Sequence, residues 1–159
     1  MMKNAFFYDC PIGEIGIAEE NGAIIRLGFG NKKEVFDGCA IAETPLIKKT
    51  FQQLAEYFAG RRKKFDLPLN PQGTDFQQSV WEALQTIPFG ETRSYQDVAV
   101  MVGNPKACRA VGMANNRNPI AIIIPCHRVI GRNGSLTGYA GGLRVKQYLL
   151  DLEARYYQD

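Results

Sequence analysis

A chain of 159 residues has room for one compact domain or for two small ones. Its content of 45% hydrophobic and 22% charged residues is ordinary for a soluble globular protein, and no stretch reaches the roughly 20 apolar residues that a membrane helix needs. The formal net charge of +3 excludes little until it is mapped along the chain.

Residues 1–70 are predicted to form a small domain with a β-sheet and a helix. Short runs rich in β-branched and aromatic residues over 5–8, 13–18 and 23–29 predict strands, and Asn21-Gly22 predicts a hairpin turn. Apolar residues at helical spacing over 45–59 predict a helix that stops at Gly60. Prolines and a glycine between 68 and 73 then indicate a linker.

Residues 74–159 are predicted to form a second, mostly helical domain, which makes the fold class α+β. Thr74 and Gln77 match a capping box at the start of a helix. Ser94 is a good N-cap for a helix over 95–102, and a second helix is expected over 106–116. Two short helices joined by a turn with glycine are typical of a helix-turn-helix, and an ordinary helical hairpin is the alternative.

Basic residues are concentrated in the second domain. Between Arg93 and Lys146, eight basic residues face one acidic residue, whereas the rest of the chain has 11 basic and 15 acidic residues. Such a basic stretch indicates a surface that binds a polyanion. A solvated surface with its counter-charges elsewhere in the fold is the alternative, and charge alone does not decide between the two.

The candidate reactive centre follows an apolar run over 120–124, which predicts a buried strand. Cys126 lies just after this run, beside His127 and Arg128. Positive neighbours favour the reactive thiolate, although a lone cysteine is more often a small buried apolar residue. Because adjacent side chains of a strand point in opposite directions, a proton exchange between Cys126 and His127 requires a turn or a bridging water.

A histidine that acts as a base usually has an orienting partner. Glu153 lies at the edge of the apolar stripe of a helix predicted over 143–157, where a carboxylate is well placed to meet His127. A partly exposed glutamate is the alternative. His127 is the only histidine and the four cysteines lack paired spacing, so we expect free thiols, no disulfide and no metal. The N-terminal residues make a poor signal peptide, so we also expect a cytoplasmic protein without membrane contact.

The residues around the cysteine resemble the active-site signature of the O6-alkylguanine-DNA alkyltransferases, also called methylated-DNA–protein-cysteine methyltransferases. The signature here is Ile124-Pro125-Cys126-His127-Arg128-Val129. The resemblance covers roughly residues 74–155 and continues, in the order of the family, through Ser94-Tyr95, Gly103-Asn104-Pro105-Lys106-Ala107, Arg109-Ala110-Val111-Gly112, Asn118-Pro119, Gly138-Tyr139, Gly141-Gly142-Leu143 and Glu153. Residues 1–70 resemble the variable, ribonuclease-H-like N-terminal domain of the family only in length and in their strand-then-helix pattern.

The resemblance implies DNA repair by direct reversal of damage. Without a cofactor, the alkyl group of O6-alkylguanine, and of O4-alkylthymine, is transferred from double-stranded DNA to Cys126. The one-to-one chemistry and the small size of the chain favour a monomer. In the family a relay of glutamate, histidine and water makes the thiolate, and the matching residues are Glu153, His127 and Cys126. Tyr95 matches the residue that protonates the departing base, and Asn118 matches the one that holds the turn near the cysteine. The thioether product has no carbonyl for water to attack, so the protein is consumed.

The resemblance also implies how DNA is held. The damaged base is flipped out through the minor groove, and Arg109 takes its place in the stack. The DNA-binding residues implied are Arg109, Ala110, Gly112, Ser94 and Arg128. Those implied around the base are Tyr139, Gly141, Gly142, Val129 and Pro119. The chain departs from many relatives at Ala140, where they carry serine, and it lacks the histidines with which some members bind zinc.

Three other functions are compatible with parts of the pattern. A non-catalytic damage-binding protein of the alkyltransferase-like kind lacks the nucleophile, and Cys126 argues against it. A helix-turn-helix regulator with an inert cysteine predicts sequence-specific binding without covalent change. A thiol hydrolase that uses Cys126, His127 and Glu153 predicts many turnovers on an acyl substrate, and it leaves the basic helical pair without a purpose.

Overall fold

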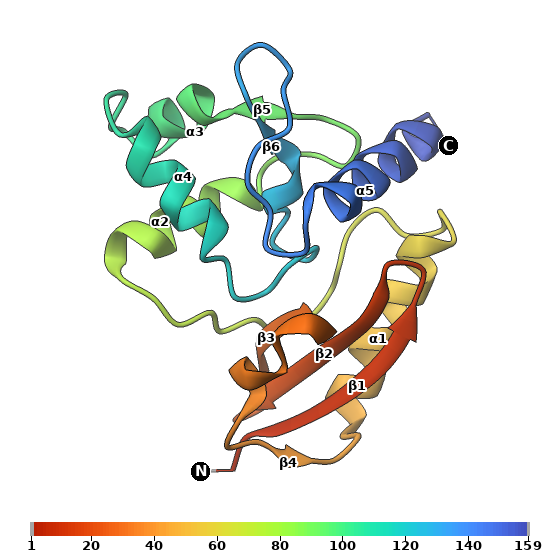
Figure 1. The fold of residues 1–159 in the computed structure, drawn as a ribbon. Coiled ribbons are helices and arrows are strands. Elements are labelled where there is room, and N and C mark those ends of the chain that lie inside the picture. Colours follow the sequence, from red (N-terminus) through yellow and green to blue (C-terminus); the bar gives the residue numbers. More distant parts are fainter. Residues whose placement is uncertain (1, 159) are drawn as a thin grey trace. The chain divides into compact units, whose positions relative to one another are not determined.

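The computed structural model describes residues 2–158, apart from the side chains of residues 31 and 32. The chain divides into two compact units, Met1–Gln72 (unit 1) and Gly73–Asp159 (unit 2). Unit 1 combines a sheet with helices and unit 2 is mainly helical (Figure 1), so the predicted α+β class is confirmed. No helix in the described part of the chain has the length and apolar character needed to cross a membrane.

Unit 1 is a four-stranded sheet whose strand order is β3-β2-β1-β4. Its elements are β1 (Asn4–Cys10), β2 (Gly13–Glu20), β3 (Ala23–Phe29), the 3-10 helix η1 (Gly30–Phe36), β4 (Ala40–Ile41) and α1 (Pro45–Phe58). The predicted hairpin is confirmed, since Asn21 and Gly22 connect β2 to β3 with φ of 55° and 75°. These left-handed values are what a tight two-residue hairpin turn requires. The two-residue strand β4 was not predicted, because so short a strand leaves no periodic signal.

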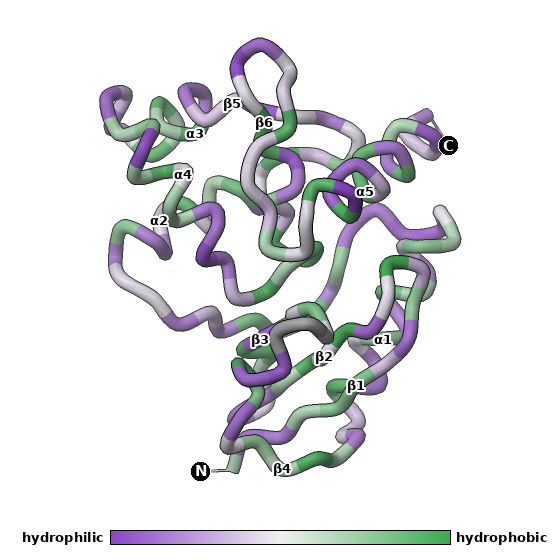
Figure 2. The backbone as a smooth tube through the Cα atoms, in the orientation of Figure 1, coloured by the Kyte–Doolittle hydropathy of each residue, from purple (hydrophilic) through white to green (hydrophobic). Residues whose placement is uncertain are grey.

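Unit 2 begins with a helix and ends with a longer one. Its elements are α2 (Asp75–Leu84), β5 (Arg93–Ser94), α3 (Tyr95–Met101), α4 (Cys108–Asn116), the 3-10 turn η2 (Cys126–Arg128), β6 (Val129–Ile130) and α5 (Leu143–Tyr156). Helices α2, α3 and α4 contact one another, and α5 contacts η2. Along α5, apolar and polar stretches alternate (Figure 2), as expected for a helix with one buried face.

The predicted helix starts of unit 2 are largely confirmed. The side chains of Thr74 and Gln77 form the expected capping box at α2, and Ser94 forms another with Asp97 at α3. Helix α4 begins at Cys108, two residues later than expected. The reason is a turn before it, which the amide of Ala107 closes on the carbonyl of Asn104 at 3.0 Å.

The predicted strand over residues 120–124 is wrong. These residues are buried, but they form a turn in which the amide of Ile124 donates to the carbonyl of Ile120 at 3.0 Å. Ile122 has a φ of 71°, which is unusual for a β-branched residue. The side chain of Asn118 holds the turn, because it accepts from the amide of Ile120 at 3.0 Å and donates to the carbonyl of Ile124 at 2.7 Å. An apolar composition indicates burial, but it does not reveal that a side chain replaces the strand hydrogen bonds.

Candidate active site

Cys126 is the first residue of η2, directly after the buried turn that Asn118 holds. The change of direction that the sequence required between Cys126 and His127 is therefore present. Cys126 is only 6% exposed, and burial raises the pKa of its thiol to about 11, although the Asn118 side chain and the positive charge of Lys146 act to lower it. Burial thus outweighs the positive neighbours that were expected to favour a thiolate, and the resting thiol needs a base to ionise it.

His127 has the properties of such a base. Its ring is fully buried, and Nε2 lies 2.6 Å from Oε2 of Glu153, so the predicted meeting of these two residues is confirmed. Burial lowers the pKa of His127 despite the carboxylate beside it, which makes the imidazole neutral at neutral pH. Nε2 then carries the hydrogen donated to Glu153, and Nδ1 keeps a lone pair with no hydrogen-bond partner among the described residues.

Glu153 is held by several donors at once. Arg128 donates to Oε1 at 2.8 Å through Nε and to Oε2 at 3.1 Å through Nη2, and the amide of Gly90 donates to Oε1 at 3.1 Å. Burial acts to raise the pKa of Glu153, but the hydrogen bonds and charges of His127 and Arg128 hold it well below its usual range. The carboxylate is therefore a fixed negative charge behind the imidazole.

Arg128 was predicted to contact DNA, and for its side chain this is wrong. The side chain is buried, and Nη1 donates to the carbonyl of Ile87 at 2.6 Å while the other donors bind Glu153. Its sequence position beside Cys126 indicated a positive charge, but not whether that charge faces solvent. Arg128 instead compensates Glu153 inside unit 2.

Tyr95, at the start of α3, lies beside the helix that is expected to meet DNA. Its hydroxyl is 2.8 Å from Oγ1 of Thr137 and donates to the Thr137 carbonyl at 3.3 Å. A Cβ added at Gly112 of α4 would lie 3.8 Å from the Tyr95 ring, in ordinary contact. The predicted acid and one of the predicted DNA-helix residues are thus neighbours.

Two buried polar residues of the site were not predicted. Lys146 of α5 is fully buried and donates to the carbonyls of Val129 at 2.6 Å and Thr137 at 2.8 Å. Asn115 of α4 is also buried, and its Nδ2 donates to the carbonyl of Cys126 at 3.3 Å. Their spacing held a signal that the prediction did not use, because Lys146 is three residues before the buried Leu149 and Asn115 is four residues after the buried Val111.

The five residues predicted around the base lie in different environments. Pro119 and Val129 are buried, Gly141 is half-buried, and Gly142 is exposed at the N-cap of α5. Tyr139 is half-buried as a residue, and burial of its phenol raises its pKa well above the usual value, with the charge of Cys126 acting in the same direction. Their contact with a base stays a prediction.

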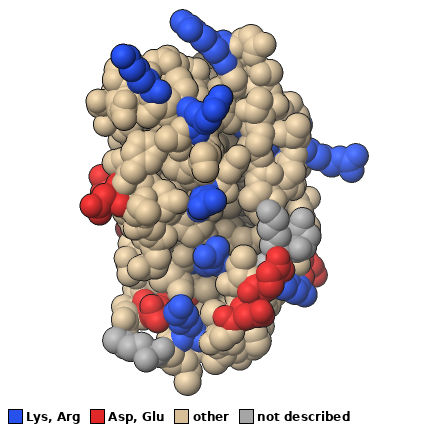
Figure 3. Space-filling view, turned by 60° about the vertical axis from the view of Figure 1, so that its left-hand side comes forward, with Lys and Arg blue, Asp and Glu red and all other residues tan. Residues whose placement is uncertain are grey.

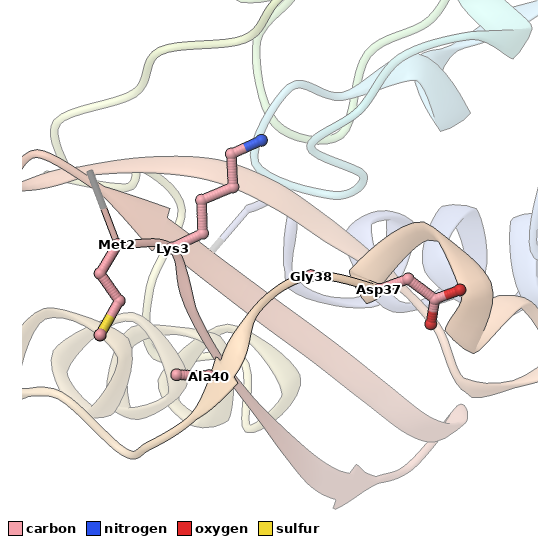
Figure 4. A pocket seen from close by; sticks show the side chains of 5 residues that line it. All are labelled: Met2, Lys3, Asp37, Gly38 and Ala40. Atoms are coloured by element: carbon pink, nitrogen blue, oxygen red, sulfur yellow. The ribbon is translucent and has the colours of Figure 1, made fainter.

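A hollow of about 530 Å³ lies elsewhere, in unit 1 (Figure 4). Its lining contains none of the predicted site residues and consists of Met2, Lys3, Asp37, Gly38 and Ala40. The charged ends of Lys3 and Asp37 point in different directions, so they do not form a shared binding site. No group of His, Cys, Asp and Glu suited to a metal ion occurs within the described part of the chain.

The basic stretch of unit 2 is less exposed than its sequence indicated. Of the eight basic residues, Arg128 and Lys146 are buried, and Arg93 pairs with Glu91 at 3.2 Å. The exposed ones are Lys106, Arg109, Arg117, Arg132 and Arg144. In Figure 3 basic side chains project singly and do not form one continuous patch.

Helix α4 presents a free surface next to the site. Arg109 and Ala110 are exposed on it, and Gly112 is half-buried. Ser94 is half-buried, and its hydroxyl is engaged as the N-cap acceptor for the amide of Asp97 at 3.0 Å. Contact of these residues with DNA stays a prediction.

Comparison with known proteins assigns each of the two units to a domain of a known family. Residues 75–155 match the family described as 6-O-methylguanine DNA methyltransferase, DNA binding domain, and residues 5–71 match its ribonuclease-like domain. Methylated-DNA–protein-cysteine methyltransferases of Methanosarcina acetivorans and Methanosarcina mazei are 52% and 63% identical to the chain. The alignments cover 92% and 90% of this chain, and 95% and 92% of the relatives. The crystal structure of Mycobacterium tuberculosis OGT in complex with DNA is similar with a TM-score of 0.91 and 45% identity, and covers 96% of this chain and 94% of that one.

Proposed function

The chain belongs to the 6-O-methylguanine DNA methyltransferase family, and from this premise we propose that Cys126 is the residue that accepts the alkyl group. The function is DNA repair by transfer of an alkyl group from DNA to a cysteine of the protein itself. The observation that carries the assignment is the neutral His127, oriented by Glu153 at 2.6 Å and adjacent in sequence to a buried thiol. Among the four cysteines, Cys126 is the one that is next to a histidine.

The geometry supports a relay for ionising the thiol. Because Nε2 of His127 donates to Glu153, Nδ1 is the atom left to accept the proton of Cys126, directly or through a water. Glu153 stabilises the imidazolium while the proton is on it, and Arg128 keeps Glu153 ionised. The charges and hydrogen bonds of these residues support the proposed roles.

The transfer itself is a displacement at carbon. The Cys126 sulfur forms a bond to the alkyl carbon while the bond from that carbon to guanine O6 breaks, and the electron pair stays on guanine. Tyr95 gives a proton to the departing base, and the tyrosinate and the imidazolium then return to neutrality by proton exchange with water, so that the net change moves one proton from the thiol to guanine. The product is a thioether, which water does not cleave, so each chain acts once. O4-alkylthymine carries its alkyl group on an equivalent exocyclic oxygen and suits the same displacement.

The damaged base has to leave the duplex to reach the sulfur of Cys126, a residue that is only 6% exposed. The exposed Arg109 of α4 is suited to fill the gap in the base stack, and the small Ala110 and Gly112 let the helix approach the minor groove closely. Since one chain is consumed for each lesion, the chemistry needs only a monomer.

Mass spectrometry of the intact protein tests this function. After mixing with duplex DNA that contains O6-methylguanine, the mass should rise by one methyl group per chain. The Cys126→Ser variant should show no increase, and Cys108→Ser, which alters another thiol of unit 2, should behave as the wild type. Tight binding of the DNA with an unchanged protein mass would contradict the proposal and support a damage-binding protein.

A further inference from the structure

The buried ammonium group of Lys146 is not explained by the relay. Its side chain has no exposure to solvent, and its two acceptors are neutral backbone carbonyls, those of Val129 and Thr137. No carboxylate forms an ion pair with it among the described residues. Burial of a charge without an opposite charge is strongly destabilising. A lysine held in this way points to a partner that acquires negative charge.

The groups around the thiol identify that partner. The charged and titratable residues in this cluster are His127, Arg128, Tyr139, Lys146 and Glu153. Arg128 and Glu153 compensate each other through two hydrogen bonds. Burial keeps the imidazole of His127 and the phenol of Tyr139 neutral, since it lowers the pKa of the first and raises that of the second. The group of this cluster that can still acquire a negative charge is the thiol of Cys126, whose turn η2 leads directly to the Val129 carbonyl that Lys146 binds.

The two hydrogen bonds of Lys146 also join two separate segments of the site. Val129 directly follows η2, the turn that carries the thiol, and Thr137 belongs to the loop before α5. The Thr137 carbonyl accepts from Lys146 at 2.8 Å and from the Tyr95 hydroxyl at 3.3 Å. One ammonium group therefore connects the thiol turn with the loop that holds Tyr95.

We propose that Lys146 is a positioning residue of the transfer reaction, whose buried ammonium group compensates the Cys126 thiolate and holds the Val129 and Thr137 carbonyls together. This inference rests on the proposed function, because it assumes that Cys126 reacts as a thiolate. The mutual influence of the two charges is consistent with it: Lys146 acts to lower the pKa of Cys126, and Cys126 acts to raise that of Lys146.

The test is the pH dependence of single-turnover transfer by three variants. Lys146→Met removes the charge and both hydrogen bonds, Lys146→Gln keeps a donor without the charge, and Lys49→Met removes an exposed lysine of α1 as a control. In both Lys146 variants the midpoint of the rate profile should move to higher pH, and the rate at neutral pH should fall by about tenfold or more. The control should match the wild type.

The shape of the profile separates charge from structure. If Lys146 were only structural, its loss would slow transfer equally at every pH and leave the midpoint in place, and that result would overturn the proposal. Transfer by the wild type itself reports on the proposed function, so failure there is distinct from failure of the inference.

A second measurement needs no variant and remains decisive if neither Lys146 variant folds. The titration of the Lys146 ammonium group in the wild-type protein is followed by nitrogen NMR, before and after methylation of Cys126. Methylation removes the group that forms the negative charge, so the methylated protein should lose the Lys146 proton at lower pH. An unchanged titration would refute the compensation.

Discussion

Replacement of Arg128 by methionine should destabilise unit 2 more than any loss of a surface ion pair. Arg128→Met removes two hydrogen bonds to the buried Glu153 and one to the carbonyl of Ile87. Breaking a buried pair from one side leaves an uncompensated charge and costs about 3–5 kcal/mol. The free carbonyl of Ile87 adds about 1 kcal/mol or more, so we expect a loss of roughly 4–6 kcal/mol.

Urea unfolding followed by the fluorescence of Trp81 measures this loss. Trp81 is the only tryptophan of the chain and is 1% exposed within unit 2, so its signal reports on that unit. Arg93→Met is the matched control, because Arg93 pairs with Glu91 at 3.2 Å but both side chains are more than a third exposed. We expect the control to lose less than about 1 kcal/mol.

A double variant separates the charge from the packing. Adding Glu153→Gln to Arg128→Met removes the carboxylate charge that Arg128 no longer compensates, and part of the lost stability should return. The reasoning fails if Arg128→Met costs no more than Arg93→Met, or if the two changes in the double variant are simply additive.

Three further outcomes are expected. Arg109→Ala should slow repair of O6-methylguanine in a duplex by about tenfold or more while leaving attack on free O6-benzylguanine unchanged, because only the duplex requires base flipping; equal losses on both substrates would remove the role of Arg109. Gly90→Ala should destabilise unit 2 by about 1–3 kcal/mol in the same fluorescence assay, since Gly90 has a φ of 83° and an added Cβ would lie 2.1 Å from the Tyr157 ring. Unit 2 should lose stability as the pH falls from about 6.5 toward 3. The pKa values of His127 and Glu153 are below their ordinary values, so the unfolded chain binds more protons than the folded one in this pH range. Glu153→Gln should make the free energy of unfolding less dependent on pH at the acid end, and an unchanged dependence would contradict the role given to Glu153.

Local signals in the sequence were enough for most elements. Capping residues such as Thr74 and Ser94 act on amides three positions away, so their effect on the helix start does not depend on the rest of the fold. The Asn21-Gly22 turn is local in the same sense. The contact of Glu153 with His127 was also predictable, because a carboxylate at the edge of an apolar stripe needs a polar partner at the boundary of the core.

The errors concern features that depend on tertiary contacts. The turn over residues 120–124 depends on the side chain of Asn118, and the burial of Arg128 depends on Ile87 and Glu153, which are distant in sequence. The pKa of Cys126 depends on how much water reaches the sulfur. The positive residues next to it in the sequence give no information about that. Lys146 was missed because a lysine is expected to reach solvent, even though its helical spacing places it on the face of Leu149.

The charges of the site help to explain why each chain transfers only one alkyl group. With the thiol protonated, Arg128 and Glu153 cancel and Lys146 is an uncompensated positive charge. Transfer of the thiol proton to His127 leaves this total charge unchanged, but it places a negative charge on the sulfur that Lys146 acts to stabilise. Methylation removes the negative charge from the sulfur, and a thioether has no proton to release. The chemical block to turnover is therefore accompanied by an electrostatic one, because the methylated sulfur can never again supply the charge that Lys146 lacks.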